Sequence, residues 1–124
     1  MNDCIKLVRN KLTLFILFLA CTLFLQAQET ITNTKKTKNG LVVLQINADF
    51  NKNNTINLNG LKDCKVYYMD ITNANNLNVK VVPTIIIFDG KEKKRIEANI
   101  MMKLDVTSKD IQKIVDNLIL EKFN

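Results

Sequence analysis

VVPTIIIFDG, residues 81–90, contains the only proline of the chain, close to the start of a run of β-branched and apolar residues. Proline has no backbone N–H and a fixed φ, so a sheet tolerates it only at an edge, at a bulge or at the first residue of a strand. The valine and threonine that flank Pro83 favour extended backbone. The stretch therefore predicts a buried strand over residues 81–88 that opens near the proline, followed by a tight hairpin turn at Asp89-Gly90.

Three further strands are predicted around this stretch. Residues 41–46 (LVVLQI) form a nearly continuous apolar run, as in a strand buried on both faces. Residues 65–71 (KVYYMDI) are rich in aromatic and β-branched residues, which is typical of a second strand. After the hairpin turn the chain alternates, and this predicts a return strand with Ile96, Ala98 and Ile100 on one face.

The segments between these strands predict short connections and one helix. Residues 47–54 have the composition of a loop, residues 55–63 have at most a turn or two of helix, and residues 73–80 have a short helix or loop. Thr107 or Ser108 can cap a C-terminal helix. Strands separated by crossovers favour parallel pairing and the hairpin adds an antiparallel pair, so the fold class is α/β with a mixed sheet. The helix has an apolar stripe of Ile111, Ile114, Val115, Leu118 and Ile119.

The composition excludes several classes of site. The 124 residues include no histidine, which excludes Ser-His-Asp triads, Cys-His dyads and His-ligated metals. Two of the three cysteines lie within residues 1–27, which we expect to be removed, and Cys64 alone can form neither an internal disulfide nor a cysteine-rich zinc site. The net charge of +6, or +4 without residues 1–27, is too mild to indicate nucleic-acid binding, and residues 91–95 (KEKKR) fit a solvated turn. We therefore expect no cofactor, no metal and no nucleic-acid partner.

Residues 1–27 have the pattern of a secretory signal peptide. Three basic side chains precede an uncharged run, residues 12–25, and Ala27 supplies a small residue at the expected cleavage site. Fourteen helical residues span only about 21 Å, less than the roughly 30 Å of a hydrocarbon core. We therefore expect a periplasmic or secreted protein. The main alternative is an uncleaved membrane anchor, and a weaker one is a lipoprotein cut at Cys21.

The remaining chain of about 97 residues has room for one domain. Residues 28–40 are polar and rich in Thr and Lys, as in a linker or an edge strand, and they end in an Asn-Gly turn signal. Residues 41–124 are then the domain itself.

The segment around Pro83 resembles the thioredoxin family. VPTIIIFDGKE, residues 82–92, is similar to the family's segment of Val or Ile, Pro, Thr, three apolar residues, Phe and a turn glycine. LVVLQINADF, residues 41–50, resembles the central strand and its approach to the redox motif, and Asp70 resembles the aspartate that ends the next strand. The resemblance covers residues 41–119. It implies a cis-proline at Pro83 and a three-layer fold with a mixed, mostly parallel sheet, a short first helix, and a C-terminal hairpin and helix.

The resemblance fails at the redox motif. In the family, Cys-x-x-Cys at a helix N-terminus supplies an attacking thiolate. When Phe50 is aligned with the aromatic residue before that motif, Asn51-Lys52-Asn53-Asn54 occupies it, and an amide can neither attack a disulfide nor leave as a thiolate. The family's buried acid falls on Gln45, which does not titrate either. We therefore expect no dithiol oxidoreductase activity, and the pattern argues against an enzyme.

Without cysteines, the remaining candidate site is a binding groove. In the family the backbone of the residue before the proline pairs with an extended substrate segment, and such strand addition needs no particular side chain. The resemblance places Val82, Pro83 and Thr84 on one side of this groove, with Phe50 and Asn51 across it. The leading hypothesis is an exported, redox-inactive binding or scaffold module with an extended peptide or protein as partner. The alternative is that the segment only shapes the sheet.

Cys64 supports a different hypothesis, a monothiol redox protein that forms mixed disulfides. Lys62 and Lys65 could lower the pKa of this thiol, whereas Asp63 would oppose that change. The plain alternative is a small apolar filler or an unreactive loop thiol. A third hypothesis, a structural protein anchored by residues 1–27, makes the membrane a partner only if that segment is not cleaved.

Overall fold

The computed structural model describes residues 29–123, so the predicted signal peptide lies outside the described residues. Within this range, five strands form one sheet and no helix is long and apolar enough to cross a membrane. The elements, with η for a 3-10 helix, are β1 (Glu29–Thr30), η1 (Lys35–Lys38), β2 (Leu41–Asn47), η2 (Asp49–Asn54), β3 (Lys65–Asp70), η3 (Ile71–Asn73), η4 (Asn75–Leu77), β4 (Thr84–Asp89), β5 (Glu92–Glu97) and α2 (Ser108–Glu121).

The sheet is mixed, with strand order β1-β3-β2-β4-β5. The central strand β2 pairs in parallel with β3, where Val43 lies opposite Val66, and antiparallel with β4, where Val43 lies opposite Ile87. β1 is parallel to β3 and β5 is antiparallel to β4, so β4 alone of the described strands runs against the others. The predicted mixed α/β sheet and its hairpin are therefore confirmed. The parallel pairing expected between strands separated by crossovers holds for β2 and β3 but is wrong for β4, which is antiparallel to β2. β4 begins at Thr84, directly after the proline.

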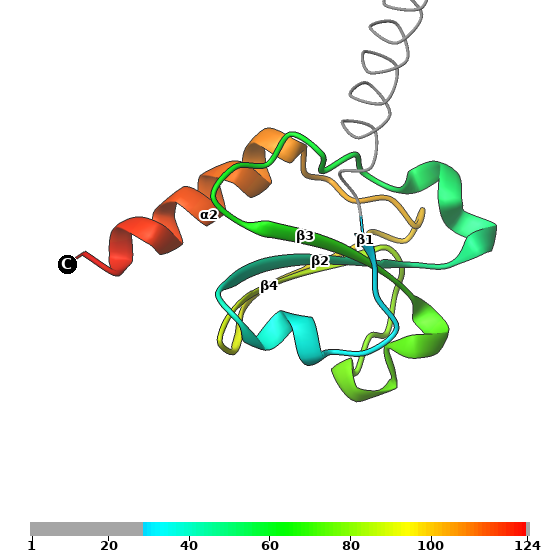
Figure 1. The fold of residues 1–124 in the computed structure, drawn as a ribbon. Coiled ribbons are helices and arrows are strands. Elements are labelled where there is room, and N and C mark those ends of the chain that lie inside the picture. Colours follow the sequence, from blue (N-terminus) through cyan, green and yellow to red (C-terminus); the bar gives the residue numbers. More distant parts are fainter. Residues whose placement is uncertain (1–28, 124) are drawn as a thin grey trace, which may run out of the picture.

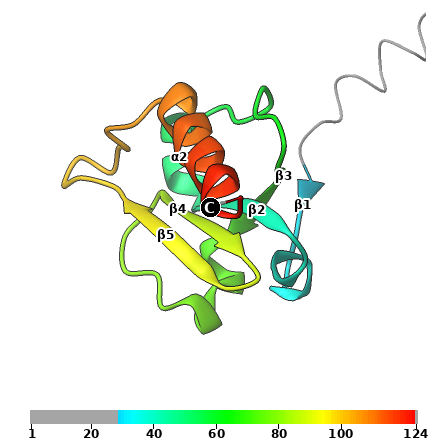
Figure 2. The ribbon, with the colours of Figure 1, turned by 90° about the vertical axis from the view of Figure 1, so that its left-hand side faces the viewer.

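Both faces of the sheet are covered. Figures 1 and 2 show α2 over one face and the short helices η1, η3 and η4 over the other. This explains why β2 is apolar at consecutive positions, because neither of its faces meets water. Val42, Leu44 and Ile46 pack toward the short helices, whereas Val43 packs in the second cluster with α2. The second cluster includes Leu41, Val43, Leu58, Ile85, Ile87, Ile111 and Val115.

The helix α2 begins at a capping box, which confirms the predicted cap at Thr107. The Thr107 hydroxyl accepts a hydrogen bond from the Asp110 N–H at 3.3 Å, and the Asp110 carboxylate accepts one from the Thr107 N–H at 2.8 Å. These bonds pair two backbone donors that a helix N-terminus otherwise leaves open. Ile111 and Val115 of the predicted stripe are fully buried, and its other members pack against the same cluster.

Replacing Thr107 with Ala is expected to lower the free energy of unfolding by about 1 kcal/mol at pH 7. Bonds from the Thr107 backbone and hydroxyl hold the pKa of Asp110 below its ordinary value. A lowered folded-state pKa stabilises the fold above the unfolded pKa of about 4, and this contribution is lost as the pH falls through the folded-state pKa. The difference between the two proteins should therefore shrink in urea titrations toward pH 3. Ser108→Ala is the control, because Ser108 makes no cap bond; an equal loss there would contradict the prediction.

The connection between β2 and β3 differs from the prediction. Residues 49–54, expected to be a loop, form η2, and residues 55–63, expected to hold a turn or two of helix, contain none in the described backbone. Two glutamine side chains fasten this extended segment. Gln45 exchanges two hydrogen bonds with the backbone of Ile56, at 2.8 and 2.9 Å, and Gln112 of α2 does the same with Lys62, at 2.8 and 3.1 Å. Side-chain amides therefore replace the bonds that a helix would have supplied.

The return strand is shorter than the alternation predicted. β5 ends at Glu97, and Ile100, expected on its inner face, is 99% exposed. The reason is Asn99, whose N–H donates to the Lys103 carbonyl at 2.8 Å while its side-chain oxygen accepts from the N–H groups of Met101 and Lys103. These bonds close residues 99–103 into a loop, and the loop presents its apolar side chains to solvent.

Candidate functional site

The segment before β4 carries a cis peptide bond between Val82 and Pro83, as the resemblance implied. Pro83 and Thr84 are buried, and neither lines a cavity wall at this site. Val82 is only 8% exposed, but it does line the cavity described next. Of the three residues expected to form the groove, Val82 therefore contributes surface, and the other two support it from within the sheet.

A cavity of about 340 Å³ lies between η2, the segment before Pro83 and the loop of residues 99–103. Phe50, expected across the groove, is 76% exposed and lines this cavity, together with the 99% exposed Ile100. Exposed apolar side chains gathered around one hollow are unusual on a soluble surface and mark interaction sites. We call this hollow the cis-proline groove. Its lining is Ala48, Phe50, Ile71, Val79, Lys80, Val81, Val82, Asn99, Ile100 and Met102.

Asn51, which the resemblance places at the family's first motif cysteine, is buried and connects the walls of the groove. Its side-chain nitrogen lies 3.3 Å from the Val82 carbonyl, 3.0 Å from the Met102 carbonyl and 3.2 Å from the side-chain oxygen of Asn47. Because an amide has two hydrogens, three acceptors must share them. Asn54, at the second cysteine position, donates to the Asn51 side-chain oxygen at 2.7 Å. The degenerate motif therefore acts as a structural link between three segments.

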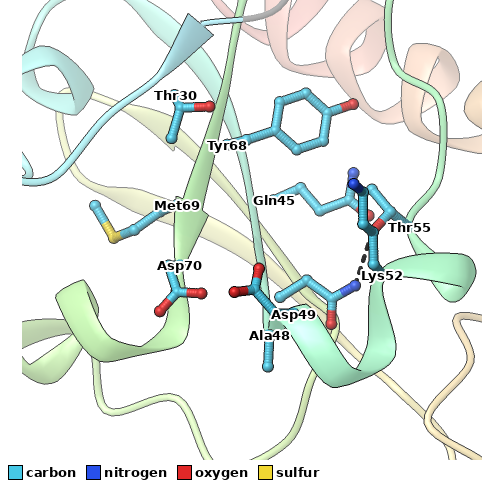
Figure 3. A pocket seen from close by; sticks show the side chains of 10 residues that line it. Thr30, Gln45, Ala48, Asp49, Lys52, Thr55, Tyr68, Met69 and Asp70 are labelled. Atoms are coloured by element: carbon cyan, nitrogen blue, oxygen red, sulfur yellow. Dashed lines mark hydrogen bonds between the residues drawn. The ribbon is translucent and has the colours of Figure 1, made fainter.

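The other two motif positions, Lys52 and Asn53, are exposed. Lys52 lines a second hollow of about 390 Å³ on the other side of η2, where Figure 3 shows the carboxylates of Asp49 and Asp70 turned toward one another. The hydroxyl and N–H of Thr72 hold the pKa of Asp70 below its ordinary value. Among residues 29–123, no group of three or more Cys, Asp or Glu side chains is placed to hold a metal ion.

Gln45, at the family's buried-acid position, is fully buried and lies at the edge of this second hollow. Its side chain does not reach the cis-proline groove; both ends of its amide are engaged with Ile56. Tyr68 adds a hydroxyl bond to the same Ile56 carbonyl at 3.1 Å. Gln45, which the resemblance places at the family's buried-acid position, therefore holds the Ile56 backbone in this structure.

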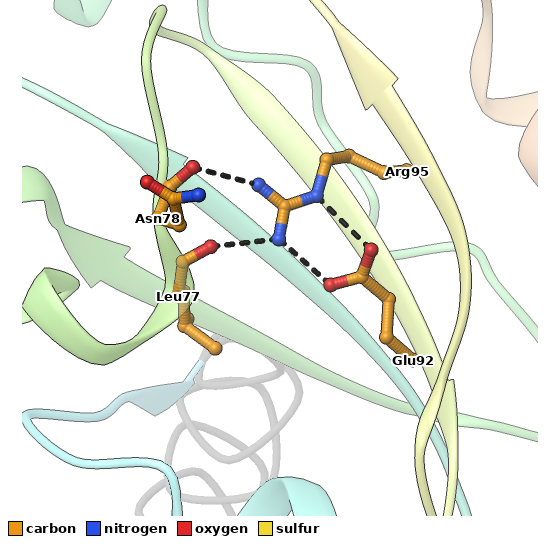
Figure 4. A network of polar contacts seen from close by, with 4 residues as sticks. All are labelled: Leu77, Asn78, Glu92 and Arg95. Atoms are coloured by element: carbon orange, nitrogen blue, oxygen red, sulfur yellow. Dashed lines mark hydrogen bonds and ion pairs between the residues drawn. The ribbon is translucent and has the colours of Figure 1, made fainter.

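Arg95 fixes the chain segment that leads into residues 79–82 of the groove. Figure 4 shows its guanidinium donating to the carbonyls of Leu77, at 2.7 Å, and Asn78, at 3.1 Å, while two further bonds join it to Glu92. The planar guanidinium can serve all these acceptors at once, which a lysine could not. The residues that follow Asn78 line the groove. The expected solvated turn over residues 91–95 is thus wrong for residues 92–95, which lie in β5, although Lys93 and Lys94 are exposed.

Cys64 lies away from the groove, at the opposite end of β2 next to Leu41. Partial burial raises the pKa of its thiol from 9.0 to about 11, and the charges of Asp63 and Asp116 add to this effect. Asp63 thus raises the pKa of Cys64, as its charge predicts, after the larger effect of burial. A half-buried thiol with a raised pKa is a poor nucleophile at neutral pH, which disfavours the monothiol hypothesis.

Alkylation of Cys64 by iodoacetamide at pH 7.5 is expected to be roughly a hundredfold slower than that of free cysteine, because two pKa units lower the thiolate fraction by that factor. Mass spectrometry should show the rate rising about tenfold per pH unit up to pH 10. Asp116→Asn should accelerate it by removing one negative charge. A rate that levels off below pH 8.5 would restore the monothiol hypothesis.

Similarity to known proteins is found only in comparisons of structure. No family model matches the chain, and no curated protein does. A mutant thioredoxin from Halobacterium salinarum NRC-1 superimposes with a TM-score of 0.54 at 14% identity, over 73% of this chain and 88% of that one. Thioredoxin from Schistosoma mansoni gives 0.54 at 14% identity, over 73% and 94%, and a designed protein gives 0.55 at 15%, over 75% and 98%. The chain therefore has a thioredoxin-like fold.

Proposed function

We propose that this chain is an exported, redox-inactive binding or scaffold module that holds an extended segment of a partner protein in the cis-proline groove. The observation that carries the proposal is the collection of exposed apolar side chains around that groove. Phe50, Ile100 and Met102 are 76%, 99% and 44% exposed, although water contact with such large apolar groups is unfavourable. A concave apolar site with a few polar groups is the usual form of a binding pocket.

The absence of redox activity is supported by the chemistry at the motif. Asn51 and Asn54 offer amides that are committed to hydrogen bonds, and Cys64 lies at the other end of the sheet. The purified protein should therefore fail to accelerate insulin reduction by dithiothreitol. Acceleration above the uncatalysed rate would contradict this part of the proposal.

Binding can be tested with a peptide library displayed on phage and selected on the immobilised protein. Peptides that occupy the groove should lose at least about tenfold in affinity for Phe50→Ser and for Ile100→Ser, as is usual at the centre of an interface. Phe123→Ser is the matched control, because Phe123 is 83% exposed but lies at the C-terminus, outside the groove. Selected peptides that bind all four proteins equally would contradict the groove as the site.

Export is the least direct part of the proposal, since it depends on residues 1–27. Protein recovered from a cell that expresses the whole chain should begin within a residue or two of Gln28, as intact-mass spectrometry would show. A protein that retains its N-terminus and sediments with membranes would support the anchored alternative instead.

A further inference from the structure

The backbone beside the groove has unpaired hydrogen-bond donors, whereas its carbonyls each already have a partner. All three carbonyls of residues 81–83 already accept hydrogen bonds from within the chain. The donors to these carbonyls are the Thr84 hydroxyl at 2.7 Å, the Asn51 side-chain amide at 3.3 Å and the Ala98 N–H at 3.1 Å. The N–H groups of Val81 and Val82, by contrast, have no acceptor among residues 29–123.

The side chains that line the groove also offer few hydrogen-bond acceptors. Eight of its ten lining residues are apolar, and the other two are Lys80 and Asn99. Asn99 is committed to its own loop through Asp105 and two backbone N–H groups, so Lys80 supplies the one uncommitted polar side chain among the described residues that line the groove. No acidic residue lines it; Asp49, between Ala48 and Phe50, lines the neighbouring hollow instead. The groove is therefore apolar with a positive edge.

We propose that the cis-proline groove binds the C-terminal end of a peptide chain, with an apolar last side chain in the cavity and the terminal carboxylate on the N–H groups of Val81 and Val82 and the ammonium of Lys80. This inference rests on the proposed function and names the chemistry of the partner. A carboxylate accepts several hydrogen bonds and has no proton to donate, which matches a site with unpaired donors and one cation. Capture of a terminal carboxylate by backbone N–H groups is a known mode of peptide recognition.

The surface around the cavity favours a peptide over a free fatty acid, which has the same head group. The cavity, at about 340 Å³, lies at the lower end of the range for ligand pockets, roughly 300–1,000 Å³. Ile100 at the rim of the cavity is 99% exposed, and Met101, its neighbour in the chain, adds a second apolar side chain that is 68% exposed. The residues that precede a peptide's C-terminus can cover this outer surface, whereas a single acyl chain that fills the cavity leaves it in water.

The test is fluorescence anisotropy of the purified protein with a fluorescein-labelled hexapeptide that ends in Val-Phe, made with a free carboxylate and with a C-terminal carboxamide. The carboxylate form is expected to bind about tenfold more tightly at low salt, and less so at 0.5 M salt, where the charge of Lys80 is screened. Lys80→Gln should reduce the ratio to about twofold. Lys91→Gln, in the hairpin turn at the other end of the sheet, is the matched control and should leave the ratio unchanged.

The outcomes separate this inference from the proposed function. Equal binding of the two peptides, with the dependence on Phe50 retained, would overturn the carboxylate inference and leave the groove as a peptide site. Failure of both peptides to bind would overturn both proposals. Displacement of the peptide by decanoate at equal concentration would show that the groove recognises apolar carboxylates generally, and a peptide as the partner would then be wrong.

Discussion

Replacing Gln45 with Leu is expected to lower the free energy of unfolding by about 3 kcal/mol. Leucine has a similar volume, so no large cavity is created, but the amide that serves Ile56 is lost. The Ile56 N–H then has no partner in a partly buried setting, and its carbonyl keeps only the Tyr68 hydroxyl. An unpaired buried polar group costs about 1–3 kcal/mol, and the extended segment of residues 55–58 loses its attachment to the sheet as well. Urea denaturation at pH 7 measures the difference.

The chain supplies its own control for this experiment. Gln112 makes the same reciprocal pair with the backbone of Lys62, but at the surface, where water can replace either bond. Gln112→Leu should therefore cost less than about 1 kcal/mol. Similar losses in the two variants would mean that burial of Gln45 contributes little.

Gln45→Glu adds a dependence on pH. A protonated carboxyl can both donate to and accept from Ile56, as the amide does, whereas a carboxylate can only accept and is penalised by burial. The folded-state pKa of the new acid should therefore lie above its unfolded value of about 4.3. A raised pKa stabilises the fold below the unfolded pKa, and this stability is lost as the pH rises through the folded pKa. The variant should approach the wild-type protein near pH 4 and fall behind it at pH 7; a constant difference would contradict the role assigned to Gln45.

Local sequence patterns predicted most of the fold. Three elements depend on residues that are neighbours in the sequence or lie within about one helical turn: the apolar run of β2, the hairpin at Asp89-Gly90 and the stripe of α2. The spacing of apolar residues and the identity of the turn residues were therefore enough to find them. Pro83 marked the start of β4 because few positions in a sheet accept a residue without an N–H. Burial on both faces of the sheet then followed from composition alone.

Long-range hydrogen bonds between side chains and backbone were missed. Gln45 holds a segment eleven residues away, and Asn51 holds segments thirty-one and fifty-one residues away. No periodicity reveals such pairs, and Asn51 is one asparagine among many in this chain. The signal that was present is a pair of asparagines, Asn51 and Asn54, where the resemblance implies two cysteines. Ile100 was misplaced for a related reason, because the bonds of Asn99 override the alternation of β5.

Asn51→Asp is expected to lower the free energy of unfolding by about 3 kcal/mol at pH 7 and to loosen the groove. The substitution keeps the shape of the side chain but removes both donated hydrogens. A carboxylate would then face the carbonyls of Val82 and Met102 and the side-chain oxygen of Asn47, all of which are acceptors. Only the bond from Asn54 would remain favourable. Urea denaturation measures the loss, and amide hydrogen exchange locates it.

Hydrogen exchange distinguishes a link between segments from a local contact. If Asn51 holds the walls of the groove together, exchange in the variant should accelerate at the Met102 N–H and at the Ala98 N–H, which bonds to Pro83, more than it does at the centre of β2. Asn53→Asp is the matched control, because it places the same charge two residues away on an exposed side chain and should change stability by less than about 0.5 kcal/mol. Equal losses in the two variants would assign the effect to charge. Uniform acceleration across the sheet would mean that Asn51 stabilises the fold as a whole and does not shape the groove.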